Sequence, residues 1–336
     1  MVMKKQLIMT DLPSHHCATI VGYEGGTLGA CYGGWECTDN QRILLFSLDH
    51  DGQCRSDFFR FEDRTGNPLL IRYQNEIFII YSYFEKDIEE VNHPVMRWAY
   101  CSQWVRKITV SNNSFNVEER RPLFKNPQIG FLCRCSPIES DGKLVLPLYH
   151  ESSRYGVFFE WMNDMAKMLG KVGQGGNALI QPSIWFDGSR YHMLGRNMRP
   201  SIYGAHAWYS SSVNLKNWQE PLLEPTIDNF NNSLVVINDD EPDPLIIWNK
   251  GCNRNSLMLG KLSGHGLGRE LITLNTQSHP KYGAYPNYCF DLDDNLHLIW
   301  TDADEMIKRR GNKYPRLVIG HLMLKPVDYR ILRSAR

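Results

Sequence analysis

The stretch IQPSIWFDGSRYHMLGR, residues 180–196, carries the pattern that decides the fold class. A Gln181-Pro182 pair stands near its start, an Asp187-Gly188 pair in its middle, and apolar or aromatic residues on both sides of that second pair. Asp-Gly between two runs of strand-forming residues is a strong signal for a β-hairpin. The stretch therefore predicts two short antiparallel strands, with a proline in the first.

Three further stretches repeat this order of an x-Pro pair, a turn and an apolar strand. They are Gly66–Leu69 before EIFIIYS (76–82), Cys135–Ile138 before DGKLVLPLY (141–149), and Ala284–Asn287 before DDNLHLIWT (293–301). Hairpins that recur every 40–50 residues or so are typical of a β-propeller, whose four-stranded blades surround an axis. The 336 residues allow six to seven blades, so we expect an all-β protein with one propeller domain over residues 1–336.

Two other architectures fit the hairpin signal at this stage. A β-sandwich and a two-domain all-β protein would show recurring hairpins as well. Helical periodicity is scarce, and the segment EWMNDMAKMLGK (160–171) is the place where we expect one or two helical turns.

Composition excludes several classes of function. The chain has 37 Lys and Arg against 37 Asp and Glu, so its formal net charge is zero. A nucleic-acid binder or a protein of anionic membrane surfaces would carry a basic excess. Aromatic residues make up 12% of the chain, enough to build a large core, so intrinsic disorder is excluded.

Cysteines and the N-terminus bear on the compartment. The nine cysteines are odd in number, scattered, and form no CxxC pair, so we expect free thiols, no disulfide framework and no metal site. The start of the chain lacks a continuous apolar region with a cleavage site, and no window approaches 18 apolar residues. We therefore expect a cytoplasmic protein without a membrane span, although export by another route would leave the same pattern.

An ordered series of short motifs resembles a known family. The series consists of SHHCATIV (14–21), GTLGACYGGWE (26–36), Gly66-Asn67-Pro68, Leu146-Pro147 with Glu151, IQPS (180–183) with Arg196, Asn231-Asn232-Ser233, Trp248-Asn249 with Arg254, and Tyr285-Pro286. In this order it resembles the sialidase-like (BNR-repeat) β-propellers and spans nearly the whole chain. The resemblance implies six blades. The segment SVNLKNW (212–218) is similar to a degenerate Asp box but also to the hairpin of five-bladed glycosidases, which keeps a five-bladed propeller as an alternative.

The resemblance implies a site for an acidic sugar. Sialidases bind the sugar carboxylate with three arginines, because a planar fork of donors matches a carboxylate. Arg196 and Arg254 stand at two of these positions, and the first arginine has no match, with His16 near its place. For each arginine taken alone, an ordinary salt bridge is the alternative.

The implied catalytic residues include one departure from the family. Tyr285 matches the tyrosine nucleophile, and the glutamate that should activate it falls at Gln181, an amide that cannot act as a base. A carboxylate from a neighbouring blade, such as Glu151, would have to replace it. An ordinary core tyrosine is the alternative reading of Tyr285.

Other positions complete the candidate site. Glu36, beside Trp35, lies near the loop that supplies the acid/base carboxylate in the family. His15 and His16 are candidates for a base or a carboxylate contact. Asn67, Asn249 and Asn232 are candidates for hydrogen bonds to sugar hydroxyls, with structural turns as the alternative.

These expectations define a glycoside hydrolase that releases or processes a terminal acidic sugar, such as a sialic acid or a Kdo-like ulosonic acid, from a glycan. No cofactor is expected, and the sequence does not indicate an oligomeric state. One alternative is a polysaccharide lyase that neutralises a uronate carboxylate and removes the C5 proton with His or Tyr. Another is a non-catalytic propeller that binds a glycan or protein, or a different reaction recruited to the scaffold, and Gln181 favours this reading.

Overall fold

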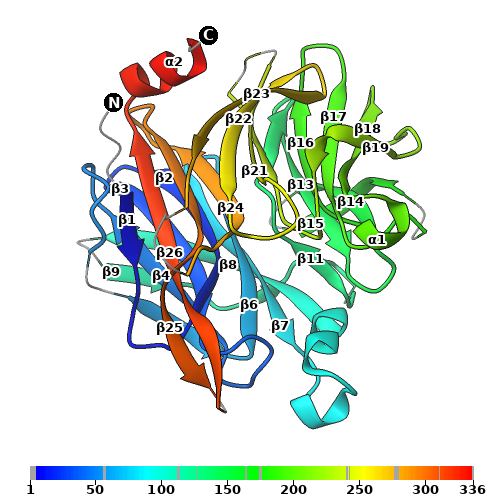
Figure 1. Ribbon diagram of the computed structural model, residues 1–336. Helices are drawn as coiled ribbons and strands as arrows, with labels where there is room; N and C mark the ends of the chain where they lie inside the picture. The colour runs from blue at the N-terminus through cyan, green and yellow to red at the C-terminus, as the bar shows by residue number, and fades with distance from the viewer. Residues whose placement is uncertain are drawn as a thin grey trace.

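The computed structural model describes residues 5–55, 58–111, 114–126, 128–162, 165–173, 176–239, 241, 243–275, 280–309 and 311–334. Its strands form six antiparallel sheets (Figure 1). The sheets follow one another along the chain, and neighbouring sheets meet through their first strands, since β2 packs against β6 and β24, and β16 against β20. This is a six-bladed β-propeller, which confirms the expected fold and excludes the five-bladed alternative.

Blade 1 contains β2 (His15–Tyr23), β3 (Gly26–Gly33), β4 (Arg42–Leu48) and β5 (Phe59–Asp63). Blade 2 contains β6 (Thr65–Tyr73), β7 (Glu76–Phe84), β8 (Cys101–Ser111), β9 (Ser114–Val117) and β10 (Arg121–Pro122). Blade 3 contains β11 (Phe131–Cys133), β12 (Ile138–Ser140), β13 (Lys143–His150), β14 (Tyr155–Met162) and β15 (Met165–Val172).

Blade 4 contains β16 (Leu179–Phe186), β17 (Tyr191–Asn197), β18 (His206–Ser212) and β19 (Leu222–Asp228). Blade 5 contains β20 (Val235–Ile237), β21 (Leu245–Asn249), β22 (Leu257–Ser263) and β23 (Gly266–Thr273). Blade 6 contains β24 (Gly283–Phe290), β25 (Leu296–Arg309), β26 (Asn312–Leu324) and, from the other end of the chain, β1 (Lys5–Ile8). The helices are η1 (Ile88–Glu90), η2 (Pro94–Tyr100), α1 (Pro200–Tyr203) and α2 (Pro326–Ser334).

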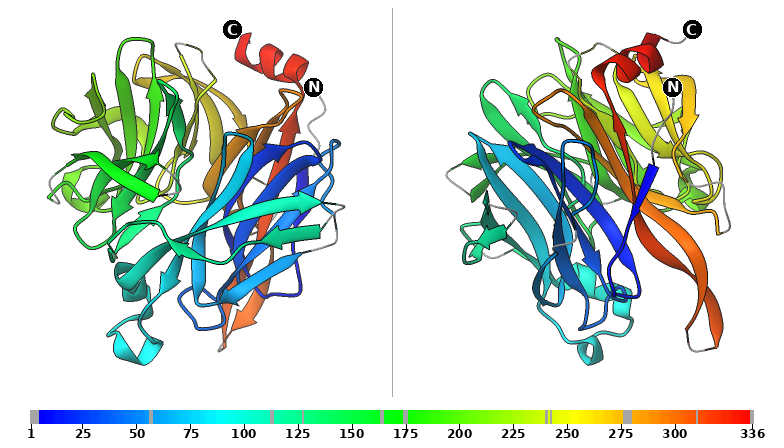
Figure 2. Two further views of the ribbon diagram at one scale, coloured as in Figure 1. Left: turned by 180° about the vertical axis from the view of Figure 1, so that it is seen from behind. Right: turned by 90° about the vertical axis from the view of Figure 1, so that its left-hand side faces the viewer.

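The ring is closed by the N-terminal strand. β1 is the outermost strand of blade 6 and pairs antiparallel with β26, with Lys5 opposite Leu322 and Ile8 opposite Ile319. Blade 6 is thus built from both ends of the described chain. Figure 2 shows β1 beside β26 in the view from the side.

Four first strands share the same irregularity. The third residues of β2, β6, β16 and β24 have positive φ, and the pairing register with the next strand shifts at that point in each blade. These residues are Cys17, Asn67, Gln181 and Tyr285, with φ of 52°, 43°, 50° and 51°. An extra residue in one strand of a pair is a β-bulge. Prolines 68, 182 and 286 follow three of these residues, because a bulge position needs no N–H for the ladder.

The bulges mark one face of the propeller. They lie where the first strands begin, and the loops between the second and third strands of the blades end at the same face, which we call the mouth face. The predicted turns at Glu24-Gly25, Asp187-Gly188 and Asp293-Asp294 join first to second strands and lie at the opposite back face. In Figure 1 the mouth face points down, with the η1–η2 segment and the β25–β26 hairpin projecting from it, and α2 lies at the back face.

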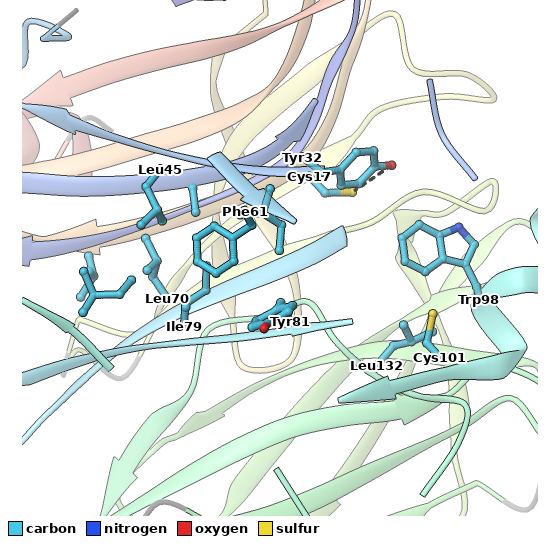
Figure 3. Packing of buried hydrophobic residues seen from close by; sticks show 14 of the residues in the cluster. Cys17, Tyr32, Leu45, Phe61, Leu70, Ile79, Tyr81, Trp98, Cys101 and Leu132 are labelled. Carbon is cyan, nitrogen blue, oxygen red and sulfur yellow. Dashed lines mark hydrogen bonds between the residues drawn. The ribbon is translucent and has the colours of Figure 1, made fainter. Parts of the chain in front are cut away.

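Apolar side chains from adjacent blades form the core between them. One cluster joins blades 1 and 2 through Leu45, Phe61, Leu70, Ile79 and Tyr81. Figure 3 shows it continuing toward Tyr32, Cys17 and Trp98. Burying one such side chain contributes about 1.5–3 kcal/mol, and the cluster thereby fixes the floor on which the mouth residues stand.

The expected helix at 160–171 is wrong. Its described residues form the end of β14 and most of β15, with Phe159 opposite Met168 and Trp161 opposite Ala166. Met, Ala and Lys favour helices intrinsically, but pairing with a strand that buries Phe158, Phe159 and Trp161 outweighs that preference. In the part of the chain that the structure describes, no helix has the length and apolar character needed to span a membrane.

Candidate functional site

A cavity of about 190 Å³ opens at the mouth face. All four bulge residues, Cys17, Asn67, Gln181 and Tyr285, line it. A residue with positive φ turns its side chain out of the regular alternation of a strand. The bulges therefore direct these side chains of four blades into one space. Non-glycine residues at positive φ cost of order 1–3 kcal/mol each, and such strain is concentrated at functional sites.

Arg196, at the end of β17, is the cation that lines this cavity. Its side chain is buried, its Nε donates to Asn231 Oδ1 at 2.9 Å, and its Nη1 donates to Gln181 Oε1 at 3.2 Å. The neighbouring contacts fix the plane of the guanidinium group. A fixed, planar donor group is suited to a carboxylate or another planar anion.

Arg254, in the loop between β21 and β22, stands beside the cavity. Its Nε donates to Asn232 Oδ1 at 3.1 Å, its Nη1 to Tyr282 Oη at 2.7 Å, and its Nη2 to Tyr285 Oη at 3.4 Å. It reaches the cavity wall through Tyr285. Burial, partly offset by Arg254, raises the pKa of Tyr282 to about 12, so this phenol stays protonated.

Two consecutive asparagines orient the two arginines. Asn231 accepts from Arg196 and Asn232 accepts from Arg254, in both cases at the Nε atom. Both asparagines precede β20, so blade 5 aligns cations from blade 4 and from its own mouth loop. The guanidinium groups lie 5.8 Å and 4.9 Å from the centre of the Tyr285 ring.

Tyr285 occupies the centre of this arrangement. An arginine can only donate, so the Tyr285 oxygen accepts from Arg254 and its own O–H must point to another acceptor. The ring of His16 meets the Tyr285 ring edge-on, with centroids 4.5 Å apart. Tyr285 is thus held by Arg254 and His16 and lines the cavity.

His16 is a buried neutral imidazole beneath Tyr285. Burial, together with the positive charges of Arg254, Arg134 and Arg196, lowers the pKa of His16 well below its usual value. Its Nδ1 is buried without a hydrogen-bond partner among the described residues. A neutral ring cannot supply the positive charge of the missing first arginine.

Gln181 stands where the family resemblance implies a glutamate. Its amide oxygen accepts from Arg196, and its Nε2 donates to Tyr149 Oη at 3.5 Å. An amide is neutral, so the Arg196 charge next to it is not neutralised, as it would be by a glutamate. The departure at Gln181 therefore removes one negative charge that the family pattern would place beside Arg196.

Two carboxylates face the same cavity. Glu36, an exposed residue of the β3–β4 loop, accepts from Trp98 Nε1 at 3.3 Å. Glu151, in the turn after β13, is half-buried, and burial raises its pKa while Arg196 and Arg154 act in the opposite direction. The structure therefore brings Glu36 and Glu151 together with Tyr285, as the residue pattern implied.

Arg134 is a functional residue that the sequence reasoning missed. It follows β11, at a break in the first strand of blade 3, and is almost fully buried. Its Nη1 donates to Ala18 O at 3.1 Å, and its Nη2 donates to Tyr285 O and, at 3.2 Å, to Pro286 O. It thus crosses the propeller axis and holds the backbone beside two of the bulges. An arginine inside the apolar run FLCRC (131–135) was the available signal.

Two predicted site residues lie elsewhere. His15 points away from the axis, where its Nε2 bonds Thr10 and its Nδ1 the Leu317 carbonyl, and burial lowers its pKa to about 4. Asn249 uses its amide to brace blades 5 and 6, donating to Gly283 O at 2.8 Å. Asn67 does line the cavity, whereas Asn232 and Asn249 are not among its lining residues.

A larger hollow, of about 790 Å³, lies at the back face, where Arg72 bonds Asn75 and Lys107 pairs with Glu76. Its charges are mixed and locally paired, whereas the mouth cavity gathers groups from five blades. Among the described residues, no cluster of His, Cys, Asp and Glu is arranged to hold a metal ion.

Comparison with known proteins agrees with this architecture. The family model for the BNR repeat-like domain matches residues 49–321. Among curated protein sequences, none matches the chain.

Solved structures give the same result at the level of fold. Trypanosoma rangeli sialidase in complex with the inhibitor DANA superposes with a TM-score of 0.66 at 13% identity, covering 96% of this chain and 56% of that one. The same sialidase in complex with sialic acid gives 0.66 at 14% identity, with the same coverage. Phage phi92 endosialidase gives 0.65 at 12% identity, covering 96% of this chain and 69% of that one. The chain therefore spans about half the length of the T. rangeli protein.

Proposed function

The chain belongs to the BNR repeat-like domain family, and on that premise we propose that it is a glycoside hydrolase that releases a terminal acidic sugar from a glycan. The observation that carries this proposal is the pair of arginines, each aligned through Nε by one of two consecutive asparagines, on either side of Tyr285. The candidate sugars are sialic acids, Kdo-like ulosonic acids and uronic acids. The superposed sialidases, one of them in complex with sialic acid, support the same class of ligand.

Arg196 and Arg254 bind the sugar carboxylate in this proposal. Their Nε atoms are already occupied, so the Nη groups present the remaining donors. Replacing the family's glutamate by Gln181 keeps a positive charge at Arg196 that a carboxylate can neutralise. Hydrogen bonds to a charged partner contribute about 1.5–3 kcal/mol each.

The chemistry uses Tyr285 and two carboxylates. Tyr285 Oη attacks the anomeric carbon, its proton passes to Glu151, and Glu36 protonates the leaving glycosidic oxygen. Glu36 then takes a proton from water, which attacks the anomeric carbon and breaks the tyrosyl–sugar bond, while Glu151 returns its proton to Tyr285 Oη; the free acidic sugar is released and both carboxyl groups regain their starting states. Glu151 takes the part that Gln181 cannot, because burial raises its pKa and makes its carboxylate a stronger base than an exposed one.

A non-catalytic acidic-glycan binder is the second candidate. It is favoured by one observation: the position that should carry the activating base holds Gln181, and its amide is already bonded to Arg196 and Tyr149. In that case the cavity would bind the terminal acid and leave the glycan intact.

One experiment separates these functions. The protein is incubated with a panel of acidic glycans, and free acidic sugar and new ultraviolet absorbance are both recorded. Free sugar without absorbance supports the hydrolase, whereas absorbance from an unsaturated product indicates a lyase. Binding without either product, lost in Arg196→Ala, indicates the non-catalytic protein.

Variants locate the activity in this cavity. We expect Arg196→Lys to lower kcat/KM roughly 10- to 100-fold, because one fork of donors is replaced by a point charge. Tyr285→Phe should remove hydrolysis while leaving binding of the acid within a few-fold. Arg199→Lys, on an exposed arginine nearby at the mouth face, is the matched control. Unchanged hydrolysis in Tyr285→Phe would show that the site is assigned wrongly.

A further inference from the structure

The segment between β7 and β8, residues 85–100, forms one wall of the cavity. It contains η1 and η2 and projects from the mouth face below β7 in Figure 1. Val95 and Trp98 of this segment line the cavity. Val95 is otherwise 54% exposed, so an apolar side chain is held at the cavity rim with little packing behind it. We call this segment the η wall.

A buried arginine fixes the η wall to blade 1. The side chain of Arg97 is fully buried, and its Nη1 donates to Cys37 O at 3.0 Å and its Nη2 to Asp39 at 2.8 Å. Its Nε donates to Lys86 O within the segment, and its guanidinium lies 4.5 Å from the centre of the Phe84 ring. Both Nη atoms therefore tie the segment to the β3–β4 loop, and Nε holds the segment together.

Trp98 completes this attachment. Its ring packs against Phe84 with centroids 4.8 Å apart, and against Tyr32 at 6.2 Å. Its indole N–H donates to Glu36, so the η wall and the proposed proton donor are positioned by one contact. Figure 3 shows Trp98 beyond Tyr32 and Cys17, on the side away from Leu45 and Leu70.

The remaining walls leave little room beyond one sugar ring. Met198, Ile180 and the buried Tyr149 line the cavity opposite the polar groups. Its volume of about 190 Å³ is below the roughly 300–1,000 Å³ of pockets that enclose drug-sized ligands. Part of that volume is needed for the carboxylate beside Arg196. With that part occupied, an N-acyl group or an extended polyol chain on the same ring needs more space than this cavity, walled on one side by Val95 and Trp98, provides.

Resting on the proposed function, we propose that the η wall restricts this cavity to a compact acidic pyranose without an N-acyl group or a long exocyclic chain. Kdo and the hexuronates share that chemistry, and N-acetylneuraminate lacks it. Val95 is then a specificity-determining residue, and Arg97 is a positioning residue that acts through the wall.

Binding of four probes tests the proposal. Dissociation constants are measured by calorimetry for Kdo, glucuronate, N-acetylneuraminate and neutral methyl glucoside. We expect wild type to bind at least one compact acid about tenfold or more tightly than N-acetylneuraminate. Val95→Ala should reduce that ratio several-fold, and Val95→Trp should abolish binding of all acids. Met96→Ala, on the exposed neighbour that does not line the cavity, is the control, and thermal unfolding shows that each variant is folded.

The outcomes distinguish this inference from the proposed function. N-acetylneuraminate bound as tightly as the compact acids, or a ratio unaffected by Val95→Ala, overturns the inference and leaves the acidic-sugar function standing. Binding of methyl glucoside but of no acid overturns the acidic-sugar function. In that case the inference about the η wall is judged on methyl glucoside. It is supported if Val95→Trp loses binding of this sugar and Met96→Ala does not, and it is overturned if Val95→Trp binds it as wild type does. Absence of binding by all four probes overturns both.

Discussion

Blades 1, 2, 4 and 6 differ from blades 3 and 5 in the way they reach the cavity. The first four place one residue of positive φ at the third position of the first strand, and that residue lines the cavity. In blade 3 the first strand is broken between β11 and β12, and Arg134 enters at the break. In blade 5 the first strand starts late, after Asn231 and Asn232.

The two groups of blades contribute different kinds of residue to the site. Each bulged blade directs one residue of its first strand into the cavity, and does so with an unfavourable backbone conformation. Blade 3 supplies Arg134, which bonds the backbone of blades 1 and 6, and blade 5 supplies the asparagine pair, which bonds Arg196 of blade 4 and Arg254 of its own mouth loop. Tyr285, which has an unfavourable backbone conformation, is thus held by Arg134 from across the ring.

Removing the support from blade 3 should give the largest effect. In Arg134→Met, the buried carbonyls of Ala18, Tyr285 and Pro286 lose their donor, which should lower the free energy of unfolding by about 4 kcal/mol. Urea unfolding measures this. Arg60→Met, which breaks an exposed pair with Asp11, should cost less than about 1 kcal/mol. If Arg134→Met costs no more than that control, blade 3 does not support the bulges.

Two consecutive histidines of β2 show, within one blade, the contrast between a residue at the site and a residue outside it. His16 faces Tyr285, whereas His15, one residue earlier, is buried outside the site with its pKa lowered to about 4. An unfolded histidine has a pKa of about 6.5, so below that pH the unfolded chain binds a proton that the folded His15 does not. Stability should therefore fall as the pH drops from about 6.5 to about 4, and His15 should account for about 3 kcal/mol of the loss.

His15→Gln should reduce this pH dependence of the free energy of unfolding without changing binding of the acidic sugar. Urea titrations at several pH values measure the slope, and the exposed His50→Gln is the control. If the slope is equal in wild type and His15→Gln, His15 does not cause this pH dependence of stability.

The smallest effect tests the bulge itself. At φ of 43°, Asn67→Val places a β-branched residue in a conformation it rarely adopts, which should cost about 2 kcal/mol of stability. Asn67→Gly should stay within about 1 kcal/mol of wild type, since glycine adopts positive φ without a steric penalty. Thermal unfolding compares the two. Equal stabilities would mean that the backbone at this bulge relaxes on substitution.

The propeller could be predicted from the sequence because its irregularities recur. Pro68, Pro182 and Pro286 mark the bulges of three first strands, where a missing N–H does no harm. The hairpin spacing alone allows six or seven blades, because blades 1 and 5 have no such pair and Ser136-Pro137 lies in a break rather than a bulge. The period therefore had to be estimated from unequal spacings.

Sequence reasoning could identify a site residue when its side-chain type and motif indicate a role. It could not do so when the role depends on which distant residues the fold brings next to it. Arg196, Glu151 and Tyr285 meet at the cavity, as the resemblance implied. His15 lies in β2 and Asn249 in β21. The side chain of His15 bonds Thr10, away from the axis, and that of Asn249 bonds Gly283 of the next blade. Arg134 could not be recognised as a support, because its partners are carbonyls more than 100 positions away in the chain.

The strand β1 has a consequence for how the molecule is made. Its pairing partner β26 leaves the ribosome more than 300 positions after β1. At roughly 5–20 residues per second, β1 waits on the order of 15–60 s before it can pair. During synthesis the blades can form one by one, while the circle stays open and an unpaired strand edge remains accessible to chaperones. Closure of the propeller therefore waits for β1 and β26 to pair.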